Sequence, residues 1–196
     1  VLEQQNEVHM IDLFILGRAF QFQKAARDAG REIVPISVNF SKNTLMYPKL
    51  MDYIKDLCDI YGMPDGMIRV EITETISNMD HIEVRRIAET LCEMGFSMSM
   101  DDFGTQYSNM QVLTQFDFDT VKIDRSLLLD VEKNLKNKTI LKHTIEMLKE
   151  LQLETVMEGV ETAEQAQILR ELGCDTIQGY FYGRPEPMDK FYELYM

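Results

Sequence analysis

Short apolar runs alternate with longer amphipathic stretches along the chain. Six of the runs have the length and the β-branched content of strands, and several carry little polar character before their last residues. That is typical of parallel strands buried on both faces of a sheet. The predicted strands are Ile33–Phe40, Ile68–Thr73, Phe96–Met100, Thr120–Asp124, Thr155–Val160 and Thr176–Tyr180.

Helical periodicity fills the intervals between these strands. The predicted helices are Val8–Ala29, Leu45–Tyr61, Met79–Met94, Asn134–Leu151, Thr162–Leu172 and a last helix that opens at Pro187. Asp80 is the expected cap of the third helix, and Thr162 and Gln165 have the spacing of a capping box. Strand alternating with helix at this spacing predicts βα units and a parallel sheet in one domain, residues 1–196.

The number of strands leaves two architectures open. A (β/α)₈ barrel takes eight strands and typically about 250 residues. This chain has 196 residues, shows six candidate strands and opens on a helix. The alternatives are an open doubly wound sheet and a barrel whose first two strands lie upstream of residue 1.

Polar side chains stand at the C-terminal end of every predicted strand, which is the end that carries the chemistry in α/β folds. They are Asn39, Glu71 and Glu74, Asp101 and Asp102, Lys122 and Asp124, Glu158 and Glu161, and Gln178. One such residue commonly only caps the next helix, but six strands share the feature. Carboxylates gathered in one pocket need cations, and Mg²⁺, Mn²⁺ and Ca²⁺ prefer oxygen ligands. Adjacent Asp101 and Asp102 suit two neighbouring metals and hydrolysis of a phosphodiester.

Charge and cysteine content narrow the classes of partner. The chain has 20 Lys and Arg against 33 Asp and Glu, a formal net charge of −13, which disfavours binding to long DNA or RNA. No stretch approaches the roughly 20 apolar residues that span a bilayer. The three cysteines are odd in number and far apart, so we expect free thiols in or near the core and a cytoplasmic location. They are Cys58, Cys92 and Cys174.

Six short motifs follow one another along the chain. They are Val38-Asn39-Phe40-Ser41, Glu71-Ile72-Thr73-Glu74-Thr75, Asp101-Asp102-Phe103-Gly104-Thr105, Val121-Lys122-Ile123-Asp124, Glu158-Gly159-Val160-Glu161 and Gln178-Gly179-Tyr180. In this order they resemble the motifs of the EAL domain, the family of cyclic-di-GMP phosphodiesterases, and Gly183-Arg184-Pro185 resembles the C-terminal signature of that family. Each motif alone is weak, but six in order over the whole chain are specific.

The resemblance implies a TIM-like barrel that hydrolyses cyclic di-GMP to the linear dinucleotide with two ions of Mg²⁺ or Mn²⁺. Asn39, Glu71 and Asp101 resemble ligands of one metal, and Asp102 resembles a ligand of the second, with a bridge between the two metals as the alternative role of Asp101. Lys122 resembles the amine that orients the attacking water or steadies a phosphate oxygen. Glu158 resembles the general base or a ligand of the second metal.

The resemblance also gives the remaining polar residues roles. Gln178 resembles an amide that touches the metal-water shell, with loop bracing as the alternative. Glu74 resembles the anchor of the loop that follows Asp102. For Lys122, the alternative is a structural lysine paired with a neighbouring carboxylate. Three further residues resemble the lining of the ligand groove: Asp124, Glu161 and Arg184.

The sequence departs from the family pattern in two places. The Glu-Ala-Leu motif of an early strand, which supplies one metal ligand, is absent, so we expect the first strands in an upstream segment and poor activity of residues 1–196 alone. Gln106 stands where the family usually has Gly, and Asn109 where it usually has Ser. In the family this loop connects metal binding to the dimer contact, so the departure bears on regulation in a homodimer.

The leading hypothesis is therefore an EAL-type phosphodiesterase in bacterial second-messenger signalling. The family often carries an upstream sensory or GGDEF domain. The second hypothesis is a catalytically silent EAL module that binds cyclic di-GMP or a protein partner. The third is a barrel lyase with Lys122 as a Schiff-base amine, which is disfavoured because clustered acids raise the pKa of a lysine.

Overall fold

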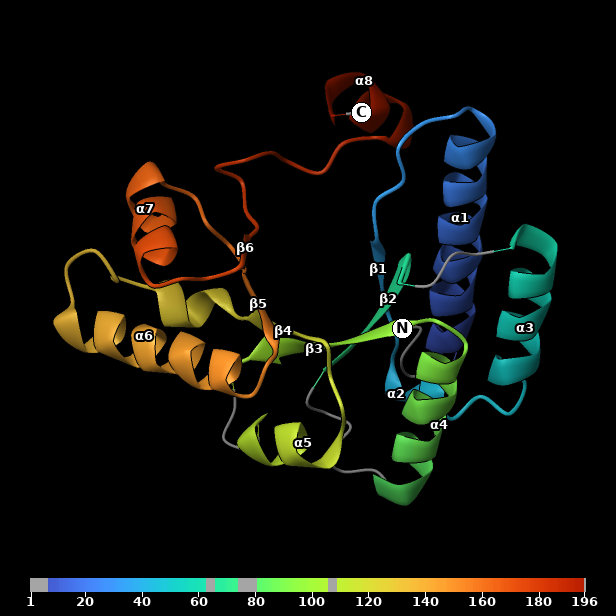
Figure 1. Cartoon of the computed structure of the whole chain (residues 1–196), viewed down its shortest axis with the longest axis horizontal. Helices are drawn as coiled ribbons and strands as arrows, with labels where there is room; N and C mark the ends of the chain where they lie inside the picture. Colours follow the sequence, from blue (N-terminus) through green and yellow to red (C-terminus); the bar gives the residue numbers. More distant parts are fainter. Residues whose placement is uncertain (1–6, 63–65, 74–80, 106–108, 196) are drawn as a thin grey trace. The chain divides into compact units, whose positions relative to one another are not determined.

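The computed structural model describes residues 7–62, 66–73, 81–105 and 109–195. The chain divides into two compact units, residues 1–98 and residues 99–195, and the division falls within the third strand, β3 (Ser97–Phe103). Figure 1 shows the elements of both units in chain order.

The first unit is built on two parallel strands, β1 (Ile36–Asn39) and β2 (Ile68–Thr73). Their register places Ile36 opposite Ile68 at one end and Asn39 opposite Glu71 at the other. The helices are α1 (Val8–Asp28), α2 (Lys42–Leu45), α3 (Leu50–Tyr61) and α4 (His81–Glu93). Helix α1 contacts β1, α2 and α3 (Figure 1).

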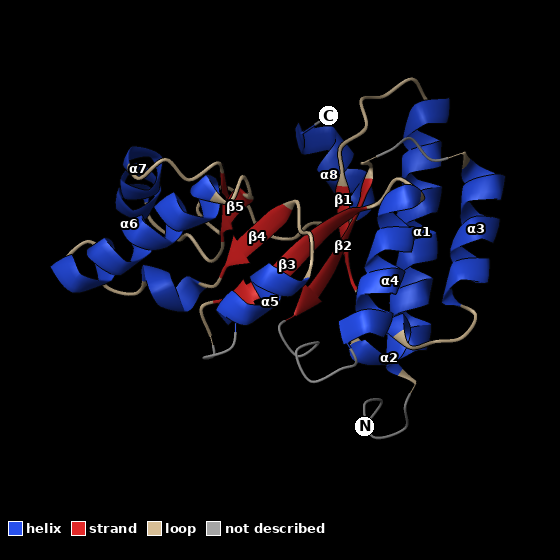
Figure 2. Cartoon of the chain, turned by 60° about the horizontal axis from the view of Figure 1, so that its bottom comes forward, coloured by secondary structure: helices blue, strands red, loops and turns tan. Residues whose placement is uncertain are grey.

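Four parallel strands form the sheet of the second unit and neighbour one another in chain order: β3, β4 (Thr120–Ile123), β5 (Glu154–Met157) and β6 (Thr176–Ile177). The helical elements are α5 (Asn109–Gln115), the 3₁₀ helix η3 (Arg125–Leu128), α6 (Leu135–Glu150), α7 (Ala163–Glu171) and α8 (Met188–Tyr195). Helix α6 packs against β5 (Figure 2) and also contacts η3.

Local signals explain where several helices begin and end. Asn134 caps α6, because its side-chain oxygen accepts hydrogen bonds from the backbone N–H groups of Lys136 and Asn137. Thr162 and Gln165 form the expected capping box at the start of α7. Gly62 ends α3 in the left-handed conformation, with φ of 55°.

All six predicted strands exist, but several boundaries differ. The first strand begins at Ile36 rather than Ile33, because Pro35 lacks the N–H that a ladder needs. The third strand continues to Phe103, so Asp101 and Asp102 lie inside it rather than after it. The fourth, fifth and sixth strands end before Asp124, Glu158 and Gln178, which begin the following loops.

The predicted helices also need correction. The predicted helix Leu45–Tyr61 begins only at Leu50, as α3, and Leu45 ends the separate short helix α2. Pro48 stands between them and disfavours the helical conformation of the residue before it. Helices α2 and α5 and the 3₁₀ helix η3 were not predicted. Asp80, the expected cap of α4, lies outside the described residues. The cysteines are free thiols, but Cys92 is exposed rather than in or near the core.

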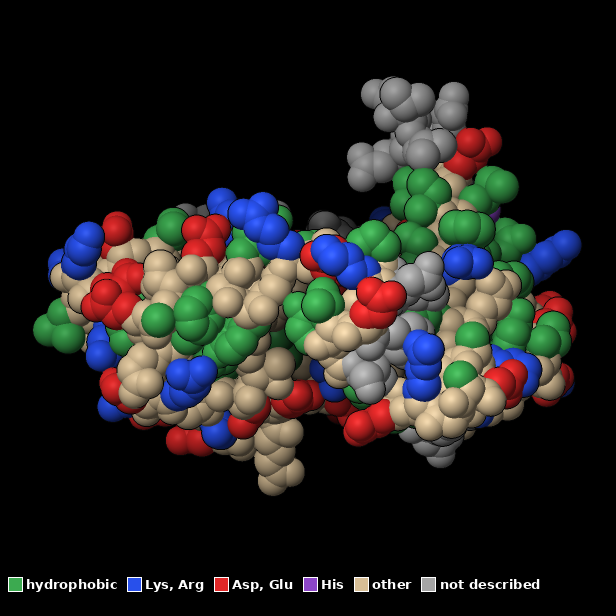
Figure 3. Space-filling model, turned by 90° about the horizontal axis from the view of Figure 1, so that it is seen from above, with side chains coloured by type: hydrophobic (Ala, Val, Ile, Leu, Met, Phe, Trp, Pro, Cys, Tyr) green, Lys and Arg blue, Asp and Glu red, His purple; other side chains and the backbone are tan. Residues whose placement is uncertain are grey.

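The surface is mixed in charge. On the face shown in Figure 3, acidic, basic and apolar side chains are interspersed. Of the helices that the structure describes, none combines the length and the apolar character needed to cross a lipid bilayer.

Candidate functional site

A buried lysine stands at the centre of the acidic cluster in the second unit. Lys122 lies on β4 between Val121 and Ile123, and it is 9% exposed. Its Nζ is 2.8 Å from Oε1 of Glu158 and 3.0 Å from Oδ1 of Asp101. Strand β4 thus carries a cation between two carboxylates, one from β3 and one from the loop after β5.

One carboxylate oxygen of Asp101, Oδ1, makes fewer polar contacts than a buried acceptor normally does. The 3.0 Å contact of its Oδ1 with Lys122 is an ion pair without hydrogen-bond geometry, and this buried oxygen has no hydrogen-bond partner among the described residues. Buried carboxylate oxygens are normally satisfied by donors or cations. An additional ligand at this oxygen would satisfy it.

Asp102 has an unusual backbone conformation. Its φ is 59°, in the left-handed region, and the pairing of β3 with β4 shifts register between Met100 and Phe103. Successive side chains of a regular strand point to opposite faces. The irregularity in β3 interrupts this alternation at Asp101 and Asp102. One carboxylate oxygen each of Asp101, Asp102 and Glu158 lies within 4.8 Å of the other two.

These three carboxylates fit a hard divalent cation. Mg²⁺ and Mn²⁺ prefer carboxylate oxygen, and the cluster offers oxygen ligands only. Asp101, Asp102 and Glu158 are each half-buried, so the cluster is reachable from solvent. Oδ1 of Asp101, which pairs with Lys122 but accepts no hydrogen bond among the described residues, supports the same assignment. The expected metal cofactor therefore agrees with the chemistry of the site.

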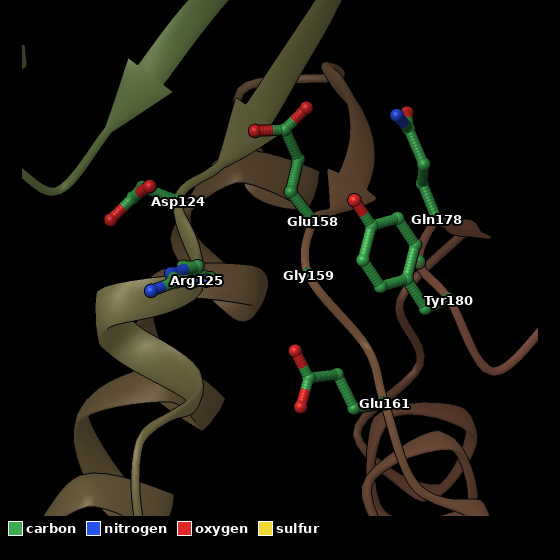
Figure 4. A pocket seen from close by; sticks show the side chains of 8 residues that line it. Asp124, Arg125, Glu158, Gly159, Glu161, Gln178 and Tyr180 are labelled. Carbon is green, nitrogen blue, oxygen red and sulfur yellow. The ribbon is translucent and has the colours of Figure 1, made fainter. Parts of the chain in front are cut away.

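A pocket of about 270 Å³ opens beside the cluster. Figure 4 shows the side chains of Glu158, Gln178 and Tyr180 extending toward the same space, with Asp124 and Arg125 on the η3 side. Its lining residues are Asp124, Arg125, Glu158, Gly159, Glu161, Gln178, Gly179 and Tyr180. Carboxylates, an amide, a guanidinium and a phenol therefore surround a space next to the Lys122 ion pairs.

Two glycines allow the loops of this pocket to approach closely. A Cβ on Gly159, whose φ is 69°, would lie 2.6 Å from Cβ of Arg125. A Cβ on Gly179 would lie 2.1 Å from the backbone oxygen of Val160. Backbone cannot yield as a flexible side chain can, so Gly179 is required for the contact that places Gln178 beside the loop after β5.

In the first unit, the structure brings two predicted site residues together. Asn39 and Glu71 are partners in the β1–β2 register, and the N–H of Phe40 donates to the backbone oxygen of Glu71 at 2.8 Å. Glu71 is 5% exposed, whereas Asn39 is exposed. An amide and a carboxylate thus share the C-terminal end of this strand pair.

The remaining predicted residues have different surroundings. Asp124 lines the pocket and also caps η3 by accepting from the N–H of Ser126. Glu161 lines the pocket through the loop before α7. Arg184 does not line it: its guanidinium lies 4.8 Å from the centre of the Tyr180 ring, in an adjoining pocket of about 490 Å³. Glu74 and Gln106 lie outside the described residues.

Sequence reasoning gave no role to two lining residues, Arg125 and Tyr180. Tyr180 stands in the motif Gln178-Gly179-Tyr180, and Arg125 directly follows Asp124. Both residues are neighbours of predicted site residues in the sequence. The residue type alone did not indicate a role, because exposed Arg and Tyr are common on protein surfaces.

Comparison with known proteins places this geometry in a family. The family model of the EAL domain matches residues 1–185. Signaling protein YkoW of Bacillus subtilis is 33% identical over 193 residues, which are 97% of this chain and 24% of that protein. Cyclic di-GMP phosphodiesterase NbdA of Pseudomonas aeruginosa is 32% identical over 186 residues, 95% of this chain and 24% of that protein. The chain thus spans about a quarter of the length of these curated relatives.

The fold is also that of solved EAL domains. The structure of the PaMucR phosphodiesterase in complex with c-di-GMP superposes with a TM-score of 0.87 at 28% identity, over 97% of this chain and 77% of that one. This likeness confirms the expected TIM-like α/β fold. Motif order, family model and fold agree, and the chain belongs to the EAL domain family.

Proposed function

We propose that the protein hydrolyses cyclic di-GMP to the linear dinucleotide with the site residues that this chain carries; residues 1–196 alone are expected to be poorly active. The observation that supports this most strongly is the cluster of Asp101, Asp102 and Glu158 around Lys122, next to a pocket. The reaction adds one water across a P–O ester bond: the hydroxyl joins phosphorus, and the proton passes to the departing ribose oxygen.

The proposed ligands are Asp101 and Asp102, together with Asn39 and Glu71 by motif. A bound divalent cation would neutralise phosphate charge and lower the pKa of water. This donor set favours Mg²⁺ or Mn²⁺. Gln178 is proposed to contact water or substrate, and Asp124, Glu161 and Arg184 to contribute to substrate binding.

Glu158 and Lys122 are proposed to act in the chemical step. Glu158 can accept the proton of the attacking water at its carboxylate. The 2.8 Å contact with Nζ of Lys122 holds that carboxylate in place. The same ammonium can stabilise charge that develops on a phosphoryl oxygen. Lys122 thus positions the base and faces the reacting group.

The test measures turnover of cyclic di-GMP by the full-length protein that carries Lys122→Ala or Glu158→Gln. Each variant is expected to lower kcat by about 10²–10³-fold and to change KM much less. Lys142→Ala is the matched control, because Lys142 is half exposed and pairs with Glu146 on α6. A loss confined to KM would make both residues binding residues. Binding of cyclic di-GMP without turnover by the full-length wild type would indicate a silent signalling module.

A further inference from the structure

A buried carboxylate of α1 binds the backbone two residues after Asn39. Asp12 is 8% exposed, and its Oδ2 accepts a hydrogen bond from the backbone N–H of Ser41 at 2.8 Å. The same oxygen accepts a second hydrogen bond from the hydroxyl of Thr44, with Oγ1 and Oδ2 2.5 Å apart. Thr44 is fully buried. Ser41 follows Asn39 by two residues.

The backbone around Asn39 is held on both sides. Upstream, β1 pairs with β2 as far as Asn39 opposite Glu71, and the N–H of Phe40 makes a further bond to the Glu71 oxygen. At Ser41 the chain turns into α2, where the hydroxyls of Ser41 and Thr44 lie 2.8 Å apart. From Ser41 onward, the bonds to Asp12 replace the strand ladder.

We propose that Asp12 is a positioning residue for the side chain of Asn39. This inference rests on the proposed function, in which Asn39 is a metal ligand. The physical reason is that the exposed amide side chain of Asn39 can rotate, so the position of its Oδ1 depends on the position of the Asn39 backbone. The hydrogen bonds of Asp12 help to hold that backbone. Residues that hold a ligand in this way change metal affinity by about 10–100-fold when they are removed.

The alternative is a purely structural role, in which Asp12 only joins α1 to α2. The two roles differ in one measurable respect. If Asp12 acts through Asn39, its removal weakens metal binding only while Asn39 is present. If it supports the fold in general, its removal has the same effect with and without Asn39.

The experiment is a double-mutant cycle of Asp12→Ala and Asn39→Ala in the whole chain, with Mn²⁺ alone as the probe and calorimetric Kd as the readout. We expect each single variant to raise the Kd about tenfold or more, and Asp12→Ala to add little in the Asn39→Ala background. Asp12→Asn, which keeps an acceptor oxygen for the Ser41 N–H, should restore most of the affinity. Amide hydrogen exchange at Ser41 should accelerate in Asp12→Ala.

The control is Asp28→Ala at the end of the same helix, where the exposed carboxylate pairs with Lys24 at 3.0 Å. Additive effects of the two variants, or an unchanged Kd in Asp12→Ala, would overturn the inference and leave the proposed function intact. An unchanged Kd in Asn39→Ala, with binding lost in Asp101→Asn, would overturn the inference and remove Asn39 from the ligand set. Absence of Mn²⁺ binding by the wild type would overturn both.

Discussion

At the scale of single residues, Asp102 shows how the backbone serves the site. An L-residue in the left-handed region costs roughly 1–2 kcal/mol, less for Asp and Asn than for most others. Here that conformation coincides with the register shift of β3 and with the gathering of three carboxylates. Strain of this kind persists where the surrounding structure holds it, commonly at functional sites.

The strain can be measured by comparing Ala with Gly at one position. We expect Asp102→Gly to be more stable than Asp102→Ala by about 1 kcal/mol, because both lose the carboxylate and only Ala pays for positive φ. At Asp101, which has no positive φ, the order should reverse. Urea unfolding of the four variants gives the two differences. The same order at both positions would show that the backbone of Asp102 relaxes without cost.

At the scale of elements, a second polar cluster joins β5 to the turn before β6. Thr155 is fully buried, its hydroxyl donates to Oδ2 of Asp175 at 2.7 Å, and it accepts the Asp175 N–H at 3.0 Å. Lys149 lies 3.2 Å from the other carboxylate oxygen. Burial favours the protonated form of Asp175, but the bonds from Thr155 and the charge of Lys149 outweigh it and hold the pKa below its usual value.

This lowered pKa gives stability a defined pH dependence. The contribution of Asp175 is present above the pKa of about 3.9 of an unfolded Asp and is lost as pH falls through the lower folded pKa. Thr155→Val should therefore reduce the free energy of unfolding by about 1–2 kcal/mol at pH 7, and by less near pH 3. Thr139→Val, whose hydroxyl bonds a helical carbonyl on α6, is the control. A loss independent of pH would mean that Thr155 acts through packing alone.

The elements that sequence predicted well are those with local signals. The strand Ile68–Thr73 matches β2 at both ends, and the Thr162 capping box is confirmed, because both depend on neighbouring residues. The break at Pro48 has a local cause that helical periodicity concealed. The conformation of Asp102 and the inclusion of Arg125 and Tyr180 in the pocket depend on contacts between distant segments. Such contacts leave no mark in the local pattern.

At the scale of the whole molecule, the proposed ligands fall in both units. Asp101 and Asp102 belong to the second unit, and Asn39 and Glu71 to the first. A ligand that binds only the folded state stabilises what it binds, by about 2.7 kcal/mol at 100 times its Kd. The expected homodimer and the upstream sensory or GGDEF domain stay predictions at this scale.

Hydrogen exchange with and without Mg²⁺ tests which of the proposed ligands bind the metal. We expect added Mg²⁺ to slow exchange in β3–β5 and also in β1 and β2, because the proposed ligands come from both sets of strands. Chelation should reverse the effect, and Asp101→Asn should abolish it. Slower exchange confined to β3–β5 would limit the ligands to the cluster of Asp101, Asp102 and Glu158.

The ion pairs of Lys122 have a consequence for how the protein folds in the cell. Carboxylates gathered without a counter-charge would repel one another until an ion arrived, and the chain would have to wait for metal in order to fold, as zinc fingers do. Lys122 supplies a covalently attached positive charge between Asp101 and Glu158. We expect a newly made chain to mature without metal, and an ion to enter or leave afterwards without unfolding it. The supply of metal would then control the activity of the protein and not the amount of folded protein.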